Sequence, residues 1–165
     1  MPIKVKVKMT EKTMYDFLLY NHYTKFSGIF ATILGVFVII LAIYNGMKGN
    51  INTTVGFIFL AVVVLFTEPI SLKSSAKRQV SKIKMFQKPL VYTFSDEGLC
   101  VTQGKDRAMN DWKSFIKVVS TKHSLILYVT RVRAIILPRE ELEENYGPIV
   151  EIIKKNVDAK KIKIK

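Results

Sequence analysis

Two long apolar runs without a charged side chain constrain this sequence more than any other feature. Residues 26–47 contain no Asp, Glu, Lys or Arg, residues 49–67 contain none either, and Lys48 alone separates the two runs. A bilayer core about 30 Å thick needs about 20 helical residues, and each run meets that length. Because both runs are apolar on every face, the rest of the 165-residue chain is too small to bury them. We therefore expect transmembrane helices over residues 26–47 and 50–68.

The segment between the runs predicts a tight turn. Gly46 and Gly49 flank Lys48 closely, so the two helices should be antiparallel neighbours in a hairpin. Small side chains allow membrane helices to approach closely, and they recur at regular spacing along the first run. This pattern is compatible with packing inside the hairpin and also with a contact between two hairpins in a homodimer. The small residues that we expect at helix contacts are Gly28, Gly35, Ala42, Gly56 and Ala61.

The net charge of +13 indicates an anionic partner, either nucleic acid or anionic lipid. Because the basic segments adjoin the second apolar run directly, we expect anionic lipid headgroups as the partner and no nucleic acid. Five lysines precede the first run and twenty Lys and Arg residues follow the second, while the turn carries only Lys48. Basic residues are retained on the cytoplasmic side of a membrane, so both termini should be cytoplasmic.

A basic segment follows the second run. Residues 69–95 contain no acidic residue, and Leu72, Ala76 and Val80 follow helical spacing on one face. This predicts a basic amphipathic helix that continues the second span over residues 69–88. Each basic side chain near an anionic leaflet contributes about 1 kcal/mol of binding; alternatively, the segment acts only as a topology signal and a connector. The residues of the expected lipid surface are Lys73, Lys77, Arg78, Lys82, Lys84 and Lys88.

From Leu90 onward the apolar residues alternate with polar ones, which predicts β-strands. Residues 95–98 (SDEG) are typical of a hairpin turn, with Gly98 able to adopt a positive φ. Short apolar runs rich in β-branched residues extend the series of strands, at residues 115–119, 125–129 and 134–137.

Helical signals follow these strands. Pro138 ends the last apolar run, and four glutamates within residues 140–144 favour the first turns of a helix. Pro148 is expected to open a second helical segment. We therefore expect residues 89–165 to form a small antiparallel β-sheet or partial barrel with a C-terminal helix, so that the whole chain is an α+β membrane protein.

Both ends of the chain alternate lysine with β-branched residues, a pattern typical of edge strands. Ile3, Val5 and Val7 share one face of such a strand, and Ile162 and Ile164 share one face of another. We interpret residues 1–25 as a strand followed by a short amphipathic helix, and we expect residues 3–9 to join the cytoplasmic sheet. The alternative is a flexible basic tail near the lipid headgroups.

Three segments resemble the YcxB-like bacterial membrane proteins. They are residues 92–99 (YTFSDEGL), Trp112 with the Ile116 and Val119 that follow it, and the strand end at residues 135–139 (IILPR). The order of a leading strand and helix, two spans and a β-rich region is similar as well. The resemblance implies a multi-pass protein of the bacterial cytoplasmic membrane whose C-terminal part is related to pleckstrin-homology-like domains. It supplies no catalytic residues.

No combination of residues predicts catalysis or metal binding. His22 and His123 are isolated from other ligands in the sequence, Cys100 is the only cysteine, and no glycine-rich phosphate loop occurs. The two spans contain no ionisable side chain, which proton- or ion-coupled transport normally needs. We expect no enzyme, no cofactor and no metal. Two function classes stay open: a membrane-anchored binding or regulatory module, with a protein partner as one option, and a self-protection protein, similar to a bacteriocin-immunity factor, that acts through its hairpin.

Overall fold

The computed structural model describes residues 2–164. Its helices are α1 (Glu11–Tyr23), α2 (Phe26–Met47), α3 (Ile51–Lys82), α4 (Lys84–Gln87), α5 (Arg139–Leu142) and α6 (Tyr146–Asn156). Its strands are β1 (Ile3–Val7), β2 (Leu90–Phe94), β3 (Gly98–Gln103), β4 (Asp106–Asp111), β5 (Lys117–Ser120), β6 (Ser124–Tyr128), β7 (Ala134–Pro138) and β8 (Ile162–Lys163). Two long apolar helices stand beside a β-rich region, and the predicted α+β class is confirmed.

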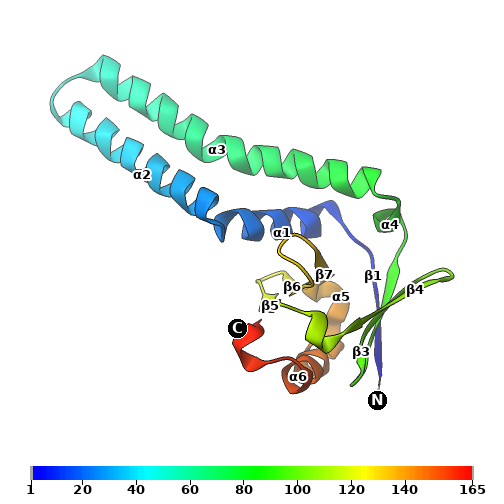
Figure 1. The fold of residues 1–165 in the computed structure, drawn as a ribbon. Helices are drawn as coiled ribbons and strands as arrows, with labels where there is room; N and C mark the ends of the chain where they lie inside the picture. The colour runs from blue at the N-terminus through cyan, green and yellow to red at the C-terminus, as the bar shows by residue number, and fades with distance from the viewer. Residues whose placement is uncertain (1, 165) are drawn as a thin grey trace.

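Helices α2 and α3 form an antiparallel hairpin that extends away from the β-rich region (Figure 1). Gly49 reverses the chain between them with a φ of 77°, a conformation that glycine adopts without strain. Helix α3 then runs without interruption for 32 residues, through Pro69 to Lys82. The expected second span and most of the expected basic helix are therefore one element, which ends at Lys82, short of residue 88.

The first sheet contains the N-terminal strand. Its order is β1-β2-β3-β4, and every neighbouring pair is antiparallel. Val5 lies opposite Tyr92 and Val7 opposite Leu90, with both valines buried and the intervening Lys6 exposed. The predicted addition of the N-terminal strand to the sheet is confirmed, because the apolar side of β1 faces the core.

The turn from β2 to β3 depends on a close approach at Gly98. Ser95 donates its backbone N–H to the carbonyl oxygen of Gly98 at 3.0 Å, and Trp112 donates its indole N–H to the carbonyl oxygen of Ser95 at 2.9 Å. A Cβ atom on residue 98 would overlap the carbonyl oxygen of Asn110 in β4. Glycine is therefore required here by the proximity of the neighbouring strand.

The second sheet has the order β7-β6-β5-β8, and β8 is parallel to β5, with Val118 opposite Ile162. The expected single antiparallel sheet is thus corrected to two sheets, one of them mixed, with no closed barrel among residues 2–164. The parallel pair forms because α6 buries Ile149 and Ile153 in the core and returns the chain to the free edge of β5. The polar, exposed β4 was not predicted, since it has no apolar alternation.

Two hydrophobic clusters hold these parts together. The larger one fills the space between the sheets, where Phe94, Phe115, Leu127 and Ile153 are fully buried. The smaller one joins α1, the C-terminal half of α3 and the second sheet, with Ala76 of α3 buried in it. Figure 1 shows α1 lying between α3 and strands β6 and β7.

The burial of β1 predicts an asymmetric response to substitution. Val7→Ala should lower the free energy of unfolding by about 2 kcal/mol, because it removes apolar area from a closed core. Lys6→Ala, on the exposed face of the same strand, should change it by less than about 0.5 kcal/mol. Denaturant titration in micelles, followed by the fluorescence of the buried Trp112, measures both values. Equal effects of the two substitutions would contradict the packing of β1.

Candidate functional site: the helical hairpin and its basic flank

The surface of the hairpin is the most unusual feature of the molecule. Most of the exposed large apolar side chains of residues 2–164 lie on α2 and on the first half of α3. The two helices are long and apolar enough to cross a membrane, and little of the apolar part of either helix is buried in the fold. A contiguous apolar surface of this extent marks an interaction site rather than a water-facing surface. These helices suggest association with a membrane.

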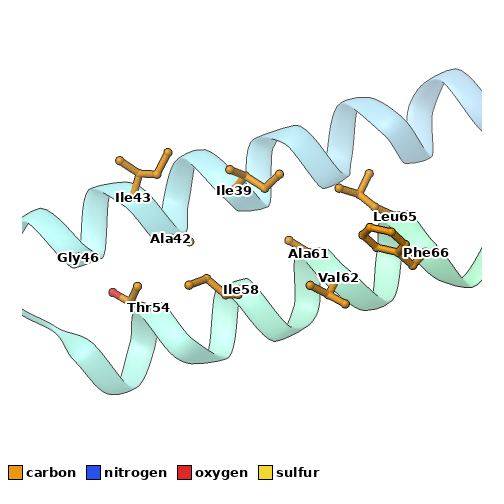
Figure 2. A pocket seen from close by; sticks show the side chains of 10 residues that line it. All are labelled: Ile39, Ala42, Ile43, Gly46, Thr54, Ile58, Ala61, Val62, Leu65 and Phe66. Atoms are coloured by element: carbon orange, nitrogen blue, oxygen red, sulfur yellow. The ribbon is translucent and has the colours of Figure 1, made fainter.

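The small residues singled out in the sequence have different roles. Gly35 faces α3, and a Cβ there would overlap the side chain of Leu65. Ala42 and Ala61 are buried as well, and both lie in the gap between the helices (Figure 2). Gly28 instead permits the close approach of α1 to α2, because a Cβ on it would overlap the backbone carbonyl of His22.

Gly56 does not take part in the contact between the helices. It lies on the exposed side of α3, and no atom comes within 4 Å of the position that its Cβ would occupy. The helical rotation explains this, since Gly56 and the buried Ala61 are five residues apart and therefore project from different faces.

An apolar groove runs between the two helices near the turn that joins them (Figure 2). It has a volume of about 440 Å³, and its walls include Ile43 and Gly46 of α2 and Thr54 and Ile58 of α3. The hydroxyl of Thr54 is the only side-chain polar group in the wall, and it donates to the carbonyl oxygen of Asn50 at 2.9 Å. A ligand or a partner helix in this groove would therefore make apolar contacts and no hydrogen bond to a free side chain.

A polar pair marks the point where the apolar surface ends. His22, near the end of α1, places its Nδ1 atom 3.9 Å from Oε2 of Glu68 on α3. The ring of His22 also contacts the ring of Tyr23 edge to face, at 5.0 Å between centroids. Lys25 follows at the start of α2 and is exposed. Polar and aromatic side chains thus lie together at the open end of the hairpin, next to α1.

The basic residues of the flank all point to solvent. On α3 they are Lys73, Lys77, Arg78 and Lys82, and Lys84 and Lys88 follow on and after α4. The opposite face of this part of α3 carries Ala76, which is buried against α1 and the second sheet. The C-terminal part of α3 thus has a basic face toward solvent and a packed face toward α1 and the second sheet.

Two further contacts fasten α1 to the β-rich region. Asp16 accepts hydrogen bonds from the hydroxyl groups of Thr121 at 2.9 Å and Ser124 at 3.0 Å. On the surface, Nζ of Lys12 lies 2.8 Å from a carboxylate oxygen of Glu140. The hydrogen bond from Lys12 holds the pKa of the Glu140 carboxyl below its usual range, and the same bond raises the pKa of Lys12. These contacts keep the hairpin and the sheets in one arrangement.

The remaining candidate groups lack the surroundings of a reactive site. Cys100 is buried in β3, where Arg107 donates a hydrogen bond to its sulfur atom at 3.1 Å. Within residues 2–164, no group of three or more His, Cys, Asp and Glu side chains is placed to hold a metal ion.

Comparison with known proteins agrees with the resemblance seen in the sequence. Residues 94–153 match the family described as YcxB-like protein, and this confirms the predicted resemblance over that segment. The matched segment begins at the end of β2 and reaches into α6, so it contains the turn at residues 95–98, Trp112 and the strand end at Pro138. No curated protein and no solved structure matches the chain.

The contact between Gly35 and Leu65 can be tested by a pair of substitutions. Gly35→Ala should lower the thermal stability of the protein in micelles, since overpacking typically costs about 1–3 kcal/mol. Leu65→Ala should restore part of the loss when it is combined with Gly35→Ala, because it removes the overlapping atoms. Gly56→Ala is the matched control on the exposed side of α3, and we expect it to be neutral. Additive losses from Gly35→Ala and Leu65→Ala would contradict the contact.

Proposed function

We propose that this protein is a membrane-anchored, non-enzymatic binding or regulatory module of the bacterial cytoplasmic membrane. The hairpin of α2 and α3 crosses the bilayer, and the β-rich region lies at the cytoplasmic face together with both termini. The observation that carries the proposal is the uninterrupted apolar exterior of the hairpin, which would be costly to leave in water. The family match at residues 94–153 supports it, because those residues lie in the β-rich region that the hairpin would anchor.

The distribution of charge supports the orientation. Among residues 2–164, only Lys48 lies at the turn of the hairpin, whereas the other basic residues lie at its open end or in the β-rich region. Basic residues favour the cytoplasmic side. The pair of His22 and Glu68, with Tyr23 beside it, then lies at the interface between the bilayer and the cytoplasm, where aromatic and polar side chains are favoured.

Because α3 is one continuous helix, the distance of each of its basic residues from the bilayer follows from the position of that residue in the helix. With a rise of about 1.5 Å per residue, Lys73 lies about 8 Å beyond Glu68 along the helix axis, and Lys82 about 21 Å beyond it. Electrostatic attraction decays over a screening length of about 8–10 Å at physiological salt. In this proposal, Lys73, Lys77 and Arg78 are the residues that attract anionic headgroups, and Lys84 and Lys88 contribute little.

The part of the hairpin inside the bilayer serves as an anchor in this proposal. Its groove contains no free hydrogen-bonding side chain with which to recognise a partner, which favours anchoring over a self-protection activity of the hairpin itself. The pleckstrin-homology-like relationship of the β-rich region belongs to the proposal as well. It is supported by the presence of two four-stranded sheets with α6 packed into the core between them.

Topology can be measured by cysteine labelling in a Cys100→Ala background. A cysteine at Lys48 should react with a membrane-impermeant maleimide on intact cells, because the turn faces outward. Cysteines at Lys4 and Lys163 should react only after the cells are opened. Labelling of either terminus on intact cells would refute the hairpin topology, and extraction of the protein by alkaline carbonate would refute insertion altogether.

The ranking of the basic residues can be measured with the full chain in nanodiscs that contain phosphatidylcholine and phosphatidylglycerol. The double variant Lys73→Gln, Lys77→Gln should lose most of the preference for phosphatidylglycerol, measured with spin-labelled lipids. The matched control Lys84→Gln, Lys88→Gln has the same change of charge and should retain it. High salt should remove the preference in the unmodified protein. Equal losses from the two double variants would contradict the ranking, because they would show that Lys84 and Lys88 lie as close to the headgroups as Lys73 and Lys77 do.

A further inference from the structure

A second cavity lies outside the hairpin, between the two sheets and beside the end of α3. Its volume is about 610 Å³, within the range of about 300–1,000 Å³ that small-molecule sites occupy. Its walls come from both sheets, with Val101 of β3 and Ile135 of β7 among them, and from α1, which contributes Phe17. The cavity is thus formed only where α1, the base of the hairpin and the two sheets meet.

The lining of this cavity is mostly apolar and adaptable, and Gln79, Tyr92, Asn110 and Arg133 are its residues with polar side chains. Met9, Met14 and Met85 contribute flexible thioether side chains, and Phe17 and Phe86 contribute aromatic rings. Methionine side chains adjust to the shape of a bound apolar group, and they are common at surfaces that accept varied apolar ligands. A long, flexible hydrocarbon chain fits this kind of wall better than a rigid polar molecule.

One charged residue lines the cavity, and it is a cation. Arg133 is in the wall and no carboxylate is. Among residues 2–164, the guanidinium group of Arg133 has neither a hydrogen bond nor an ion pair, whereas its backbone is held by the turn after β6. In that turn the carbonyl oxygen of Arg133 accepts hydrogen bonds from the N–H groups of Val129 and Thr130. An unpaired cation on a fixed backbone is suited to an anionic group of a ligand.

The rim of the cavity combines exposed apolar residues with basic neighbours. Ile83, Met85 and Val132 line the cavity and are 39%, 50% and 79% exposed. Each is adjacent in the chain to exposed basic residues, namely Lys82, Lys84, Arg131 and Arg133. Since these segments come from the end of α3, from α4 and from the turn between β6 and β7, the rim is basic on more than one side.

A short segment forms the wall next to the basic flank. Helix α4 has only four residues, and the residues on either side of it, Ile83 and Lys88, are extended. The side-chain amide of Gln103 donates to the carbonyl oxygens of Met85 at 2.8 Å and Lys88 at 3.1 Å, which fastens α4 to the end of β3. The α4 segment is therefore held by hydrogen bonds from a side chain and not by the backbone hydrogen bonds of a sheet. The side chain of Met85 in this segment is accessible.

We propose that this cavity binds a single-chain anionic lipid, a long-chain carboxylate being the simplest case. The hydrocarbon chain lies between the sheets against the methionine and aromatic side chains, and the carboxylate pairs with Arg133 at the rim. An apolar peptide is a weaker candidate, because its backbone groups would need hydrogen bonds that this lining supplies at few points. A neutral hydrocarbon would leave Arg133 unused. The inference does not depend on the hairpin crossing a membrane, since the groove of the hairpin is separate from this cavity.

The experiment uses the full chain in phosphatidylcholine nanodiscs and a palmitate analogue that carries a photoreactive diazirine on its chain. After irradiation, mass spectrometry locates the crosslinked peptides. We expect saturable crosslinks to the segments around Met85 and Ile135, which competition with unlabelled palmitate removes. Crosslinks confined to α2 and to residues 51–68 of α3 would show partition into the bilayer and would overturn the proposal.

Two pairs of variants test the site itself. Ala108 is exposed and lines the cavity, whereas Met109, the next residue in β4, does not line it. Ala108→Phe should weaken the crosslinks because its ring occupies part of the cavity, and Met109→Phe should preserve them. Arg133→Gln should weaken the competition by palmitate roughly fivefold, as expected for a partly exposed ion pair, and Lys105→Gln should not. The proposal fails if Ala108→Phe crosslinks normally, or if hexadecanol competes as well as palmitate does.

Discussion

The packing of α1 is the contact on which the rest of the structure depends. This helix lies between α3 and the second sheet, and with them it forms the smaller hydrophobic cluster. On one side it contacts α3 around the buried Ala76, and on the other side Phe17 packs against Tyr128 at 6.2 Å between ring centroids. Without α1, the hairpin would be joined to the β-rich region only through the short segment around α4.

The polar contacts of α1 make this packing specific. A carboxylate at a partly buried position is costly unless its oxygen atoms accept hydrogen bonds. Asp16 satisfies this condition with the hydroxyl groups of Thr121 and Ser124, and Ser124 is itself fully buried. A rotation of α1 about its axis would break these bonds, so the helix has one favoured orientation on the sheet. Both the basic face of α3 and the cavity beside α4 follow from that orientation.

Much of the fold was predictable because it depends on local patterns. Two charge-free runs predicted α2 and the first half of α3, and the alternation of Ile3, Val5 and Val7 with lysine predicted a strand with one buried face. Other parts had no such signal. Strand β4 is mostly polar and exposed, and it forms because β3 offers it backbone hydrogen bonds. The parallel pairing of β8 with β5 depends on where α6 packs, and this is a long-range contact.

The sequence alone determined most of the elements, their order and the segregation of charge from apolar surface, because each of these depends on the periodicity and composition of neighbouring residues. The tertiary structure decided which residues meet. It placed Gly35 against Leu65, Gly28 against α1 and Gly56 on the outside, although all three are equivalent as small residues in the sequence. It also brought Met9, Met85 and Arg133 to one cavity. These residues are far apart in the chain, and only the packing of helices on sheets makes them neighbours.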